Sequence, residues 1–336
     1  MTLPSQKIRY GIIGFGLFAE RAIAPAIQQS KNAELRAIQK RSLSVCREKA
    51  EQYHIPLSFS SVAEMVKHPD IDAVFIVSAN SAHAHGTILA AEAGKHVLVE
   101  KPMAMNVREA EQMIDACSRN GVQLMIGHMI RFSPLILRMK EIVHSGMIGN
   151  ITFARSDFFY DGRLTKRQWL QNRAVAGGGP VFDIGVHCLD TLRFILNDNV
   201  TSCKAHLSPP PTNRETELTA GITMQFLGGT VGSIYCSYDV PSRRSFIELI
   251  GTEGILSAND FTLGDRTGTL SIGLRQPPAE YIVRTEKIAI PNLYVEEVER
   301  FSKSIIEKTD SPIPGSEGLE NQRILKTIFS GDVAAQ

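Results

Sequence analysis

The chain begins with a short apolar run that ends in a cluster of small residues. The run reaches Ile13 and continues into the spacing Gly14-x-Gly16-x-x-Ala19. In a strand–turn–helix unit the first glycine permits the tight turn, the second lets a pyrophosphate approach, and the alanine packs the helix on the strand. The helix N-terminus then presents N–H groups to phosphates. The pattern predicts a dinucleotide site formed by Gly14, Phe15, Gly16, Leu17 and Phe18; the alternative is an ordinary glycine turn.

The first third of the chain alternates between strand and helix patterns. Short apolar runs at residues 35–39, 73–77, 96–100 and 122–127 are separated by helical patterns at 43–53, 81–93 and 107–120. Such alternation is typical of a doubly wound parallel sheet. We therefore expect an α/β, Rossmann-type first domain over residues 1–127.

The pattern changes after residue 127. Helical stretches at 134–145 and 180–196 flank a strand at 151–159, and strands follow at 216–226, 230–238, 246–250, 268–274 and 281–288. Gly228-Gly229 predicts a hairpin turn between two of them, and helices at 294–308 and 317–329 close the chain. This order predicts an α+β domain over residues 128–336 with a large, mostly antiparallel open sheet.

Composition limits the possible partners. The formal net charge of +1 gives no argument for binding nucleic acid or a membrane surface. The five cysteines are scattered without metal-ligand spacing, so we expect no metal site and reduced thiols in a cytoplasmic protein. No stretch predicts a signal peptide or a membrane span.

A basic turn follows the second predicted strand. In a dinucleotide fold an acidic residue at this point binds the ribose hydroxyls of NAD. Here the chain has Lys40, Arg41 and Ser42 instead, and two cations with a hydroxyl suit a 2′-phosphate. We expect NADP(H) to be preferred, with NAD(H) possible; the alternative is a solvated basic turn.

A charged pair ends the strand at 96–100. Glu100 and Lys101 precede Pro102, at the carboxyl end of a parallel strand, where ligands bind in this class of fold. A lysine there would stabilise negative charge developing on a substrate oxygen. The alternative is a surface lysine at a strand end.

Three glycines precede a helical segment with a polar face. Gly177 to Gly179 permit close approach of a ligand or of another backbone. Asp183, His187 and Asp190 follow at i, i+4 and i+7, on one helical face. A histidine flanked by carboxylates suits general acid–base catalysis, and the alternative is a polar helix face without chemistry.

Taken in order, these segments resemble the Gfo/Idh/MocA oxidoreductase family over nearly the whole chain. The resemblance rests on Gly14 to Ala19, on Ala93 to Pro102, on Arg131-Phe132-Ser133-Pro134 and on Gly177 to Asp190. It implies hydride transfer between nicotinamide C4 and a hydroxyl or carbonyl carbon. The substrate would be a sugar, a sugar derivative or a cyclitol. Lys101, Asp183 and His187 would be catalytic, with His187 as general acid or base.

The resemblance implies further contacts. The cofactor would also meet Ser78, Asn80, His83, Glu100, Lys101, Arg131 and Trp169. Many members have proline where this chain has Ala79, and an arginine often follows the tryptophan where Leu170 stands here. The family also pairs subunits through the second domain's sheet, which implies a homodimer or homotetramer.

Two other functions fit the same residues. One is a non-catalytic dinucleotide-binding sensor or regulator of the same fold, although the presence of Lys101, Asp183 and His187 argues against it. The other is an enzyme that resembles trans-dihydrodiol dehydrogenase or biliverdin reductase and acts on a non-sugar substrate.

Overall fold

The computed structural model describes residues 7–162, 165–276 and 280–330, and its contacts divide the chain into two compact units. The first unit is Met1–His128 with Tyr294–Gln322, and the second is Met129–Leu293 with Arg323–Gln336. Sequence analysis placed residues 294–322 in the second domain. The structure groups them with the first because helix α9 (Leu293–Glu307) packs on the sheet of that unit, where the hydroxyls of Tyr10 and Ser302 lie 2.9 Å apart.

The first unit contains the parallel sheet that the sequence predicts. Its strand order is β3-β2-β1-β4-β5-β6, the order typical of a doubly wound dinucleotide fold. The strands are β1 (Ile8–Ile13), β2 (Ala33–Gln39), β3 (Leu57–Phe59), β4 (Ala73–Ile76), β5 (His96–Glu100) and β6 (Leu124–Gly127). Every residue of β4 is buried, as expected for a central strand covered on both faces.

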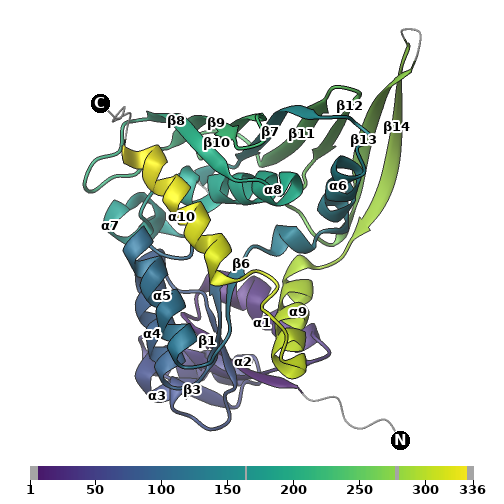
Figure 1. Cartoon of the computed structure of the whole chain (residues 1–336). Helices are drawn as coiled ribbons and strands as arrows, with labels where there is room; N and C mark the ends of the chain where they lie inside the picture. Colours follow the sequence, from purple (N-terminus) through teal and green to yellow (C-terminus); the bar gives the residue numbers. More distant parts are fainter. Residues whose placement is uncertain (1–6, 163–164, 277–279, 331–336) are drawn as a thin grey trace, which may run out of the picture. The chain divides into compact units, whose positions relative to one another are not determined.

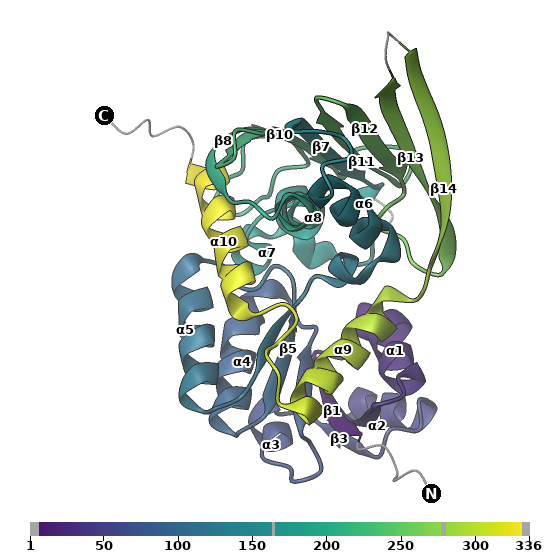
Figure 2. The same cartoon turned by 45° about the vertical axis from the view of Figure 1, so that its right-hand side comes forward.

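Helices cover both faces of this sheet. They are α1 (Ala24–Gln29), α2 (Leu43–Gln52), α3 (Val62–Val66), α4 (His83–Glu92), α5 (Val107–Arg119) and α9. Figure 2 shows α4 and α5 on one side of β1 and β5, and α1 and α9 on the other. Helix α10 (Gly315–Ser330) begins in the first unit and ends in the second.

The first helix starts with a wide turn. Residues Ala19–Ile23 form a π-helical segment, η1, directly before α1. Pro25 at the start of α1 has no N–H to donate and its ring crowds the preceding turn, so a regular α-helix cannot run through this point.

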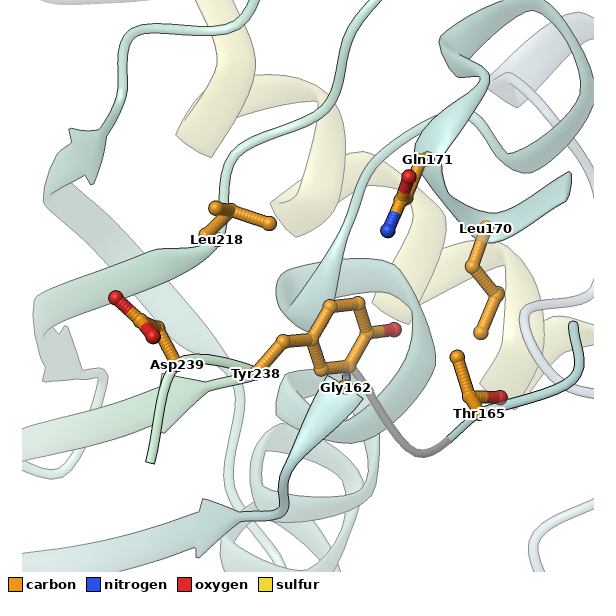
Figure 3. Close-up of a pocket in the computed structure, with 7 residues that line it drawn as sticks. All are labelled: Gly162, Thr165, Leu170, Gln171, Leu218, Tyr238 and Asp239. Carbon is orange, nitrogen blue, oxygen red and sulfur yellow. The ribbon is translucent and has the colours of Figure 1, made fainter. Parts of the chain in front are cut away.

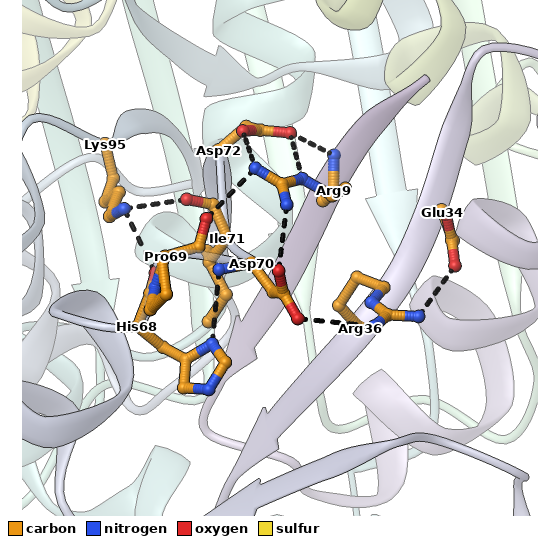
Figure 4. A network of polar contacts seen from close by, with 9 residues as sticks. All are labelled: Arg9, Glu34, Arg36, His68, Pro69, Asp70, Ile71, Asp72 and Lys95. Carbon is orange, nitrogen blue, oxygen red and sulfur yellow. Dashed lines mark hydrogen bonds and ion pairs between the residues drawn. The ribbon is translucent and has the colours of Figure 1, made fainter. Parts of the chain in front are cut away.

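Charged side chains tie together the starting ends of β1, β2 and β4 (Figure 4). The Arg9 guanidinium holds Asp72 through two bonds, Nε–Oδ2 of 2.9 Å and Nη2–Oδ1 of 2.8 Å, and reaches Asp70 Oδ1 at 3.1 Å. Arg36 joins the same Asp70 at 3.5 Å. These groups lie at the opposite strand ends from the glycine turn and stabilise the scaffold.

The second unit contains an eight-stranded sheet of order β14-β13-β12-β11-β7-β10-β9-β8. Its strands are β7 (Ile151–Phe159), β8 (Val200–Ser208), β9 (Thr219–Phe226), β10 (Val231–Ser237), β11 (Arg244–Gly251), β12 (Gly254–Asn259), β13 (Arg266–Gln276) and β14 (Glu280–Ile290). All pairings are antiparallel except β7 with β10. The predicted mostly antiparallel open sheet is confirmed.

The second unit also contains helical segments, and several of them contact the strands of this large sheet. They are η3 (Met129–Phe132), α6 (Pro134–His144), η5 (Gln168–Gln171), α7 (Arg173–Ala176), η6 (Val181–Gly185) and α8 (Val186–Leu196). Helices α6 and α8 lie side by side beneath the strands in Figure 1 and contact each other. Among the described helices, none is long and apolar enough to cross a membrane. All five cysteines are free thiols: Cys46, Cys117, Cys188, Cys203 and Cys236.

Candidate active site

The predicted glycine turn connects β1 to η1. Gly14 has φ of +86°, and a Cβ there would lie 2.6 Å from the Cα of Ser78, so only glycine fits. Gly16 differs, because a Cβ there would meet Gly14 O at 3.9 Å as its nearest neighbour. Space beside Gly16 is therefore open to an incoming group, and Leu17 is 37% exposed. The loop fits the dinucleotide pyrophosphate that the fingerprint predicts.

The end of β2 fixes this loop. Gln39 accepts a hydrogen bond from Gly14 N at 3.2 Å and donates one to Ser60 O at 2.9 Å. Phe15 N donates to Gln39 O at 2.9 Å, and the Lys40 ammonium donates to Phe15 O at 3.1 Å. Sequence analysis did not single out Gln39, although a polar residue at the end of an apolar strand was a visible signal.

The three residues expected near a 2′-phosphate lie on the turn after β2. Lys40 is half-buried, and Arg41 and Ser42 are exposed. The Ser42 hydroxyl lies 3.1 Å from that of Ser44. Two cationic groups and a hydroxyl thus share one turn beside the glycine loop, and their contact with a phosphate remains a prediction. Phe18 is half-buried, and its ring packs edge-on against Tyr294 at 5.6 Å between centroids.

A buried histidine connects the ends of β4 and β5. His83 is 1% exposed. Its Nδ1 lies 3.0 Å from Pro102 O and its Nε2 lies 3.0 Å from Ser78 O. Burial lowers the pKa of His83 to about 4, so the ring is neutral at pH 7 and can donate to only one of these carbonyls.

The loop after β4 keeps a proline-like conformation without proline. Ala79 has φ of −63° and ψ of 148°, values that a proline ring would also adopt. Half-buried Ser78 and buried Asn80 flank Ala79.

Glu100 and Lys101 lie at the end of β5. Glu100 is 7% exposed, and its Cδ is 3.5 Å from the position that a Cβ on Gly127 would take. Lys101 is half-buried and begins the loop, and the Lys101–Pro102 peptide is cis. Sequence and structure therefore agree that this pair stands at the carboxyl end of a central parallel strand.

In the second unit, Asp183 is surrounded by donors. It is 6% exposed. Its Oδ2 accepts from Tyr160 Oη at 2.9 Å, Tyr238 Oη at 3.0 Å and Arg167 Nη2 at 3.1 Å. Asp183 belongs to the π-helical segment η6, a conformation that occurs often at functional sites.

The charges in this cluster support one another. Burial raises the pKa of Tyr160 and Tyr238 above the ordinary value, and the Asp183 charge raises each further. Asp183 also raises the pKa of the Arg167 guanidinium. Both phenols therefore stay protonated, and each donates a hydrogen bond to the Asp183 carboxylate. The sequence does not indicate Tyr160, Arg167 and Tyr238 as partners of Asp183, because nothing local connects them to residue 183.

His187 follows one turn later, at the start of α8. It is 7% exposed, and its ring centroid lies 6.2 Å from that of Phe158. The structure thus places Asp183 and His187 on consecutive turns of one helical segment. Phe182 and Leu189 of the same segment are buried.

Asp190 serves a different cluster. Its carboxylate forms a bidentate pair with Arg131, Nε–Oδ2 of 2.8 Å and Nη2–Oδ1 of 2.7 Å. Both side chains are buried, and the guanidinium lies 5.2 Å from the centroid of the Phe194 ring. This pair joins η3 to α8. The proposed cofactor contact of Arg131 remains a prediction.

Trp169 is half-buried in η5, and the next residue, Leu170, is 1% exposed. Arg167, two residues before the tryptophan, places its guanidinium against Asp183.

A small pocket of about 100 Å³ adjoins the Asp183 cluster. Figure 3 shows the ring of Tyr238 among its walls, with Leu170 and Leu218 nearby. The same Tyr238 donates to Asp183 at 3.0 Å.

The predicted catalytic residues divide between the units. Lys101 belongs to the first, and Asp183 and His187 belong to the second. Their convergence on one substrate remains a prediction. Among the described residues, no group of three His, Cys, Asp or Glu side chains could hold a metal ion.

Comparison with known families gives the class of this site. A model described as an oxidoreductase family with an NAD-binding Rossmann fold matches residues 8–128. The GFO/IDH/MocA C-terminal domain matches residues 136–257. The chain is therefore built as a nicotinamide-dinucleotide oxidoreductase. It belongs to the Gfo/Idh/MocA family.

Individual relatives agree with this family. The chain is 31% identical over 268 residues to 1,5-anhydro-D-fructose reductase of Ensifer adhaerens, covering 79% of each chain. It is 30% identical over 234 residues to trans-1,2-dihydrobenzene-1,2-diol dehydrogenase of Mus musculus, covering 68% of each. The crystal structure of aldose-aldose oxidoreductase from Caulobacter crescentus complexed with glycerol superposes with a TM-score of 0.86 at 27% identity, covering 98% of this chain and 99% of that one.

Proposed function

We propose that this protein is an NADP(H)-preferring dehydrogenase or reductase acting on a CH–OH group of a sugar, a sugar derivative or a cyclitol. The observation that carries the proposal is the anchored carboxylate of Asp183, held by Tyr160, Tyr238 and Arg167 one turn before His187. Burying a carboxylate costs desolvation energy, and buried charged clusters of this kind occur often at functional sites. The similarity to an anhydrosugar reductase supports the substrate class.

Each residue has a distinct role. His187 takes the hydroxyl proton in the oxidative direction and returns it in the reductive direction, as a general base or acid. Lys101 stabilises the negative charge that develops on the same oxygen. Asp183 orients the substrate and the histidine. When bound, the dinucleotide supplies hydride transfer at nicotinamide C4.

Residues of the first unit would hold the dinucleotide. The open space beside Gly16 suits the pyrophosphate, and the turn of Lys40 to Ser42 suits the 2′-phosphate. The ends of β4 and β5, with Ser78 and Glu100, would face the nicotinamide half. Five free cysteines also fit a reducing, cytoplasmic location.

The Lys101→Ala variant tests the catalytic assignment. We expect turnover to fall by about 10²–10³-fold, as when one oxyanion-stabilising donor is removed. The dissociation constant for NADPH should stay within a few-fold of wild type. Steady-state rates and fluorescence titration measure the two quantities, and Lys67→Ala, at an exposed lysine of the same unit, is the matched control. Near-normal turnover of Lys101→Ala would refute the role.

A charge-reversed turn tests the cofactor preference. In the double variant Lys40→Asp, Arg41→Ala, the carboxylate would repel a 2′-phosphate and accept ribose hydroxyls. We expect the NADPH dissociation constant to rise at least about tenfold, which corresponds to roughly 1.4 kcal/mol, while NADH binds as well as before or better. Arg47→Ala, exposed on α2, is the control. Equal losses for both cofactors would mean that this turn does not read the 2′ position.

A non-sugar diol is the second candidate substrate, favoured by the similarity to the dihydrodiol dehydrogenase. A spectrophotometric screen that includes aldoses, cyclitols, anhydrosugars and cyclic dihydrodiols decides between the two classes. No change in NADPH absorbance across the panel, together with tight NADPH binding, would favour the sensor function instead.

A further inference from the structure

A buried carboxyl group outside the proposed reaction reaches the start of the helix that carries Asp183. Glu217 lies two residues before β9 and is 0% exposed. Its Oε1 accepts hydrogen bonds from Gly179 N at 2.9 Å and Val181 N at 3.1 Å. The contact joins segments far apart in the sequence, and the proposed chemistry does not use it.

These two amides belong to the entry of η6, which continues as α8. The first N–H groups of a helix have no acceptor within the helix. Pro180, between the two donors, has no N–H, and no cap bond is made by its own side chain. Glu217 therefore caps this helix from the segment before β9, and a carboxylate is favoured at the positive end of the helix dipole.

The glycines fit the same contact. A Cβ on Gly179 would overlap the main-chain oxygen of Glu217 and lie 3.2 Å from the Cβ of Thr216. A Cβ on Gly178 would lie 2.6 Å from the Phe182 ring. Gly179 thus lets the chain lie against residues 216–217, and Gly178 lets it lie against the helix itself. Of the two alternatives that the sequence left open for the glycines, these contacts correspond to the close approach of another backbone.

The residues that flank β9 and β10 also hold Asp183. Tyr238 N donates to Leu218 O at 2.8 Å, and the Tyr238 hydroxyl donates to Asp183 at 3.0 Å. Tyr238 is therefore bonded through its main chain to Leu218, the residue that follows Glu217. Glu217 accepts hydrogen bonds from the beginning of the helical segment, and Tyr238 donates one to the Asp183 carboxylate of the same segment.

We propose that Glu217 is a positioning residue, whose carboxyl oxygen fixes the beginning of the helix that presents Asp183 and His187. The catalytic consequence depends on the function proposed above. A shift of about 1 Å in a reacting group can reduce turnover by about 10²-fold, so loss of this cap should affect kcat while NADPH binding in the first unit is preserved.

Three substitutions test the proposal. Glu217→Gln keeps an oxygen that can accept both N–H groups, Glu217→Ala removes it, and Glu215→Ala changes an exposed neighbour. We expect kcat to fall about 10–100-fold in Glu217→Ala and to stay within about threefold of wild type in Glu217→Gln. The Glu215→Ala control should match wild type.

Hydrogen exchange separates this proposal from the proposed function. Amides of residues 179–187 should exchange faster in Glu217→Ala than in Glu217→Gln or Glu215→Ala. If His187→Ala retains turnover, the proposed chemistry fails, while the exchange result still decides the role of Glu217. If Glu217→Ala does not fold, kcat and the exchange protection of residues 179–187 in Glu217→Gln decide the proposal.

Two outcomes would overturn the proposal. One is a folded Glu217→Gln variant with a large loss of kcat and loss of exchange protection at residues 179–187. The other is a Glu217→Ala variant with wild-type kcat and wild-type protection there.

Discussion

Buried carboxyl groups in this molecule are compensated in different ways. Asp183 receives two phenols and a guanidinium, Asp190 forms a bidentate pair with Arg131, and Glu217 accepts two main-chain N–H groups. Glu297 on α9 differs from these three carboxyl groups. It is 0% exposed, and neither of its oxygens has a hydrogen-bond partner within the described structure.

The Glu297 carboxyl should therefore be protonated at neutral pH. Burial raises its pKa well above the ordinary value, and the nearby Glu100 charge raises it further. The unfolded chain releases this proton near pH 4.5 while the folded chain keeps it, so the folded state binds more protons and its stability falls as pH rises above that value.

The Glu297→Gln variant tests this dependence, because glutamine resembles the protonated acid. We expect equal Tm values for variant and wild type near pH 4. At pH 8 the variant should be higher by at least about 2 °C, the shift that 1 kcal/mol gives in a domain of this size. Thermal unfolding followed by circular dichroism from pH 4 to 8 measures the difference. A constant difference at all pH values would show that Glu297 is ionised in the folded protein.

The sequence predicted site residues that belong to local patterns, but it did not predict contacts between segments far apart in the chain. Gly14, Lys101, Asp183 and His187 stand in local patterns, so the sequence indicates their positions. The donors to Asp183 come from the end of β7, from the loop before η5 and from the residue after β10. No spacing in the sequence connects these segments, because only the register of the sheet brings them together.

At the scale of elements, helix α5 has a clear start signal in its sequence. Helix α5 begins after Asn106, whose side chain accepts from Glu109 N at 3.0 Å, while Glu109 Oε2 accepts from Met105 N at 3.1 Å. This reciprocal arrangement satisfies two donors at the helix start. The predicted range of 107–120 agrees with the observed Val107–Arg119.

Replacing this cap should weaken the first unit. Asn106→Ala removes the acceptor and should cost about 1 kcal/mol, which lowers Tm by about 2–4 °C. Asn106→Ser retains an oxygen acceptor and should recover most of the loss. Differential scanning calorimetry measures both variants, and an unchanged Tm in Asn106→Ala would contradict the role of the cap.

Several short or edge elements were not predicted from the sequence. Strand β8 escaped prediction because it is an edge strand with exposed Lys204 and His206 rather than an apolar run. Strand β3 has three residues and α3 has five, too few for a periodic pattern. The π-helical turns are local deviations from α-helical geometry, such as the turn before Pro25, and a search for the regular helical period does not detect them.

At the scale of the whole molecule, residues 294–322 near the end of the chain belong to the first unit. The change of pattern near residue 128 coincides with the observed division, but α9 and the start of α10 belong with the parallel sheet. An amphipathic helix does not reveal from its own sequence which of two sheets it covers. Contacts such as Asn32 Nδ2 to Glu299 O, at 2.8 Å, give the answer.

The large sheet predicts self-association. Phe153, Val231 and Tyr235 on β7 and β10 are 36%, 44% and 43% exposed. Exposed apolar side chains on neighbouring strands are typical of a contact surface. We expect a homodimer or homotetramer, with a solution mass of about two or four times 37.0 kDa.

Light scattering after gel filtration measures that mass. Val231→Glu places a charge on this face and should shift the protein toward the monomer. Leu227→Glu, in the nearby hairpin turn at 74% exposure, is the matched control and should not change the mass. A monomeric wild type, or equal masses for wild type and Val231→Glu, would contradict assembly through this face.

The central proposal is that Lys101 of one unit and His187 of the other act on the same substrate oxygen beside one dinucleotide. A crystal structure of the protein with NADP⁺ tests it most directly. We expect the pyrophosphate at Gly14 to Ala19, with the Lys101 ammonium and the His187 ring on the same side of the nicotinamide, next to C4. A dinucleotide bound elsewhere, or either side chain directed away from that ring, would contradict it.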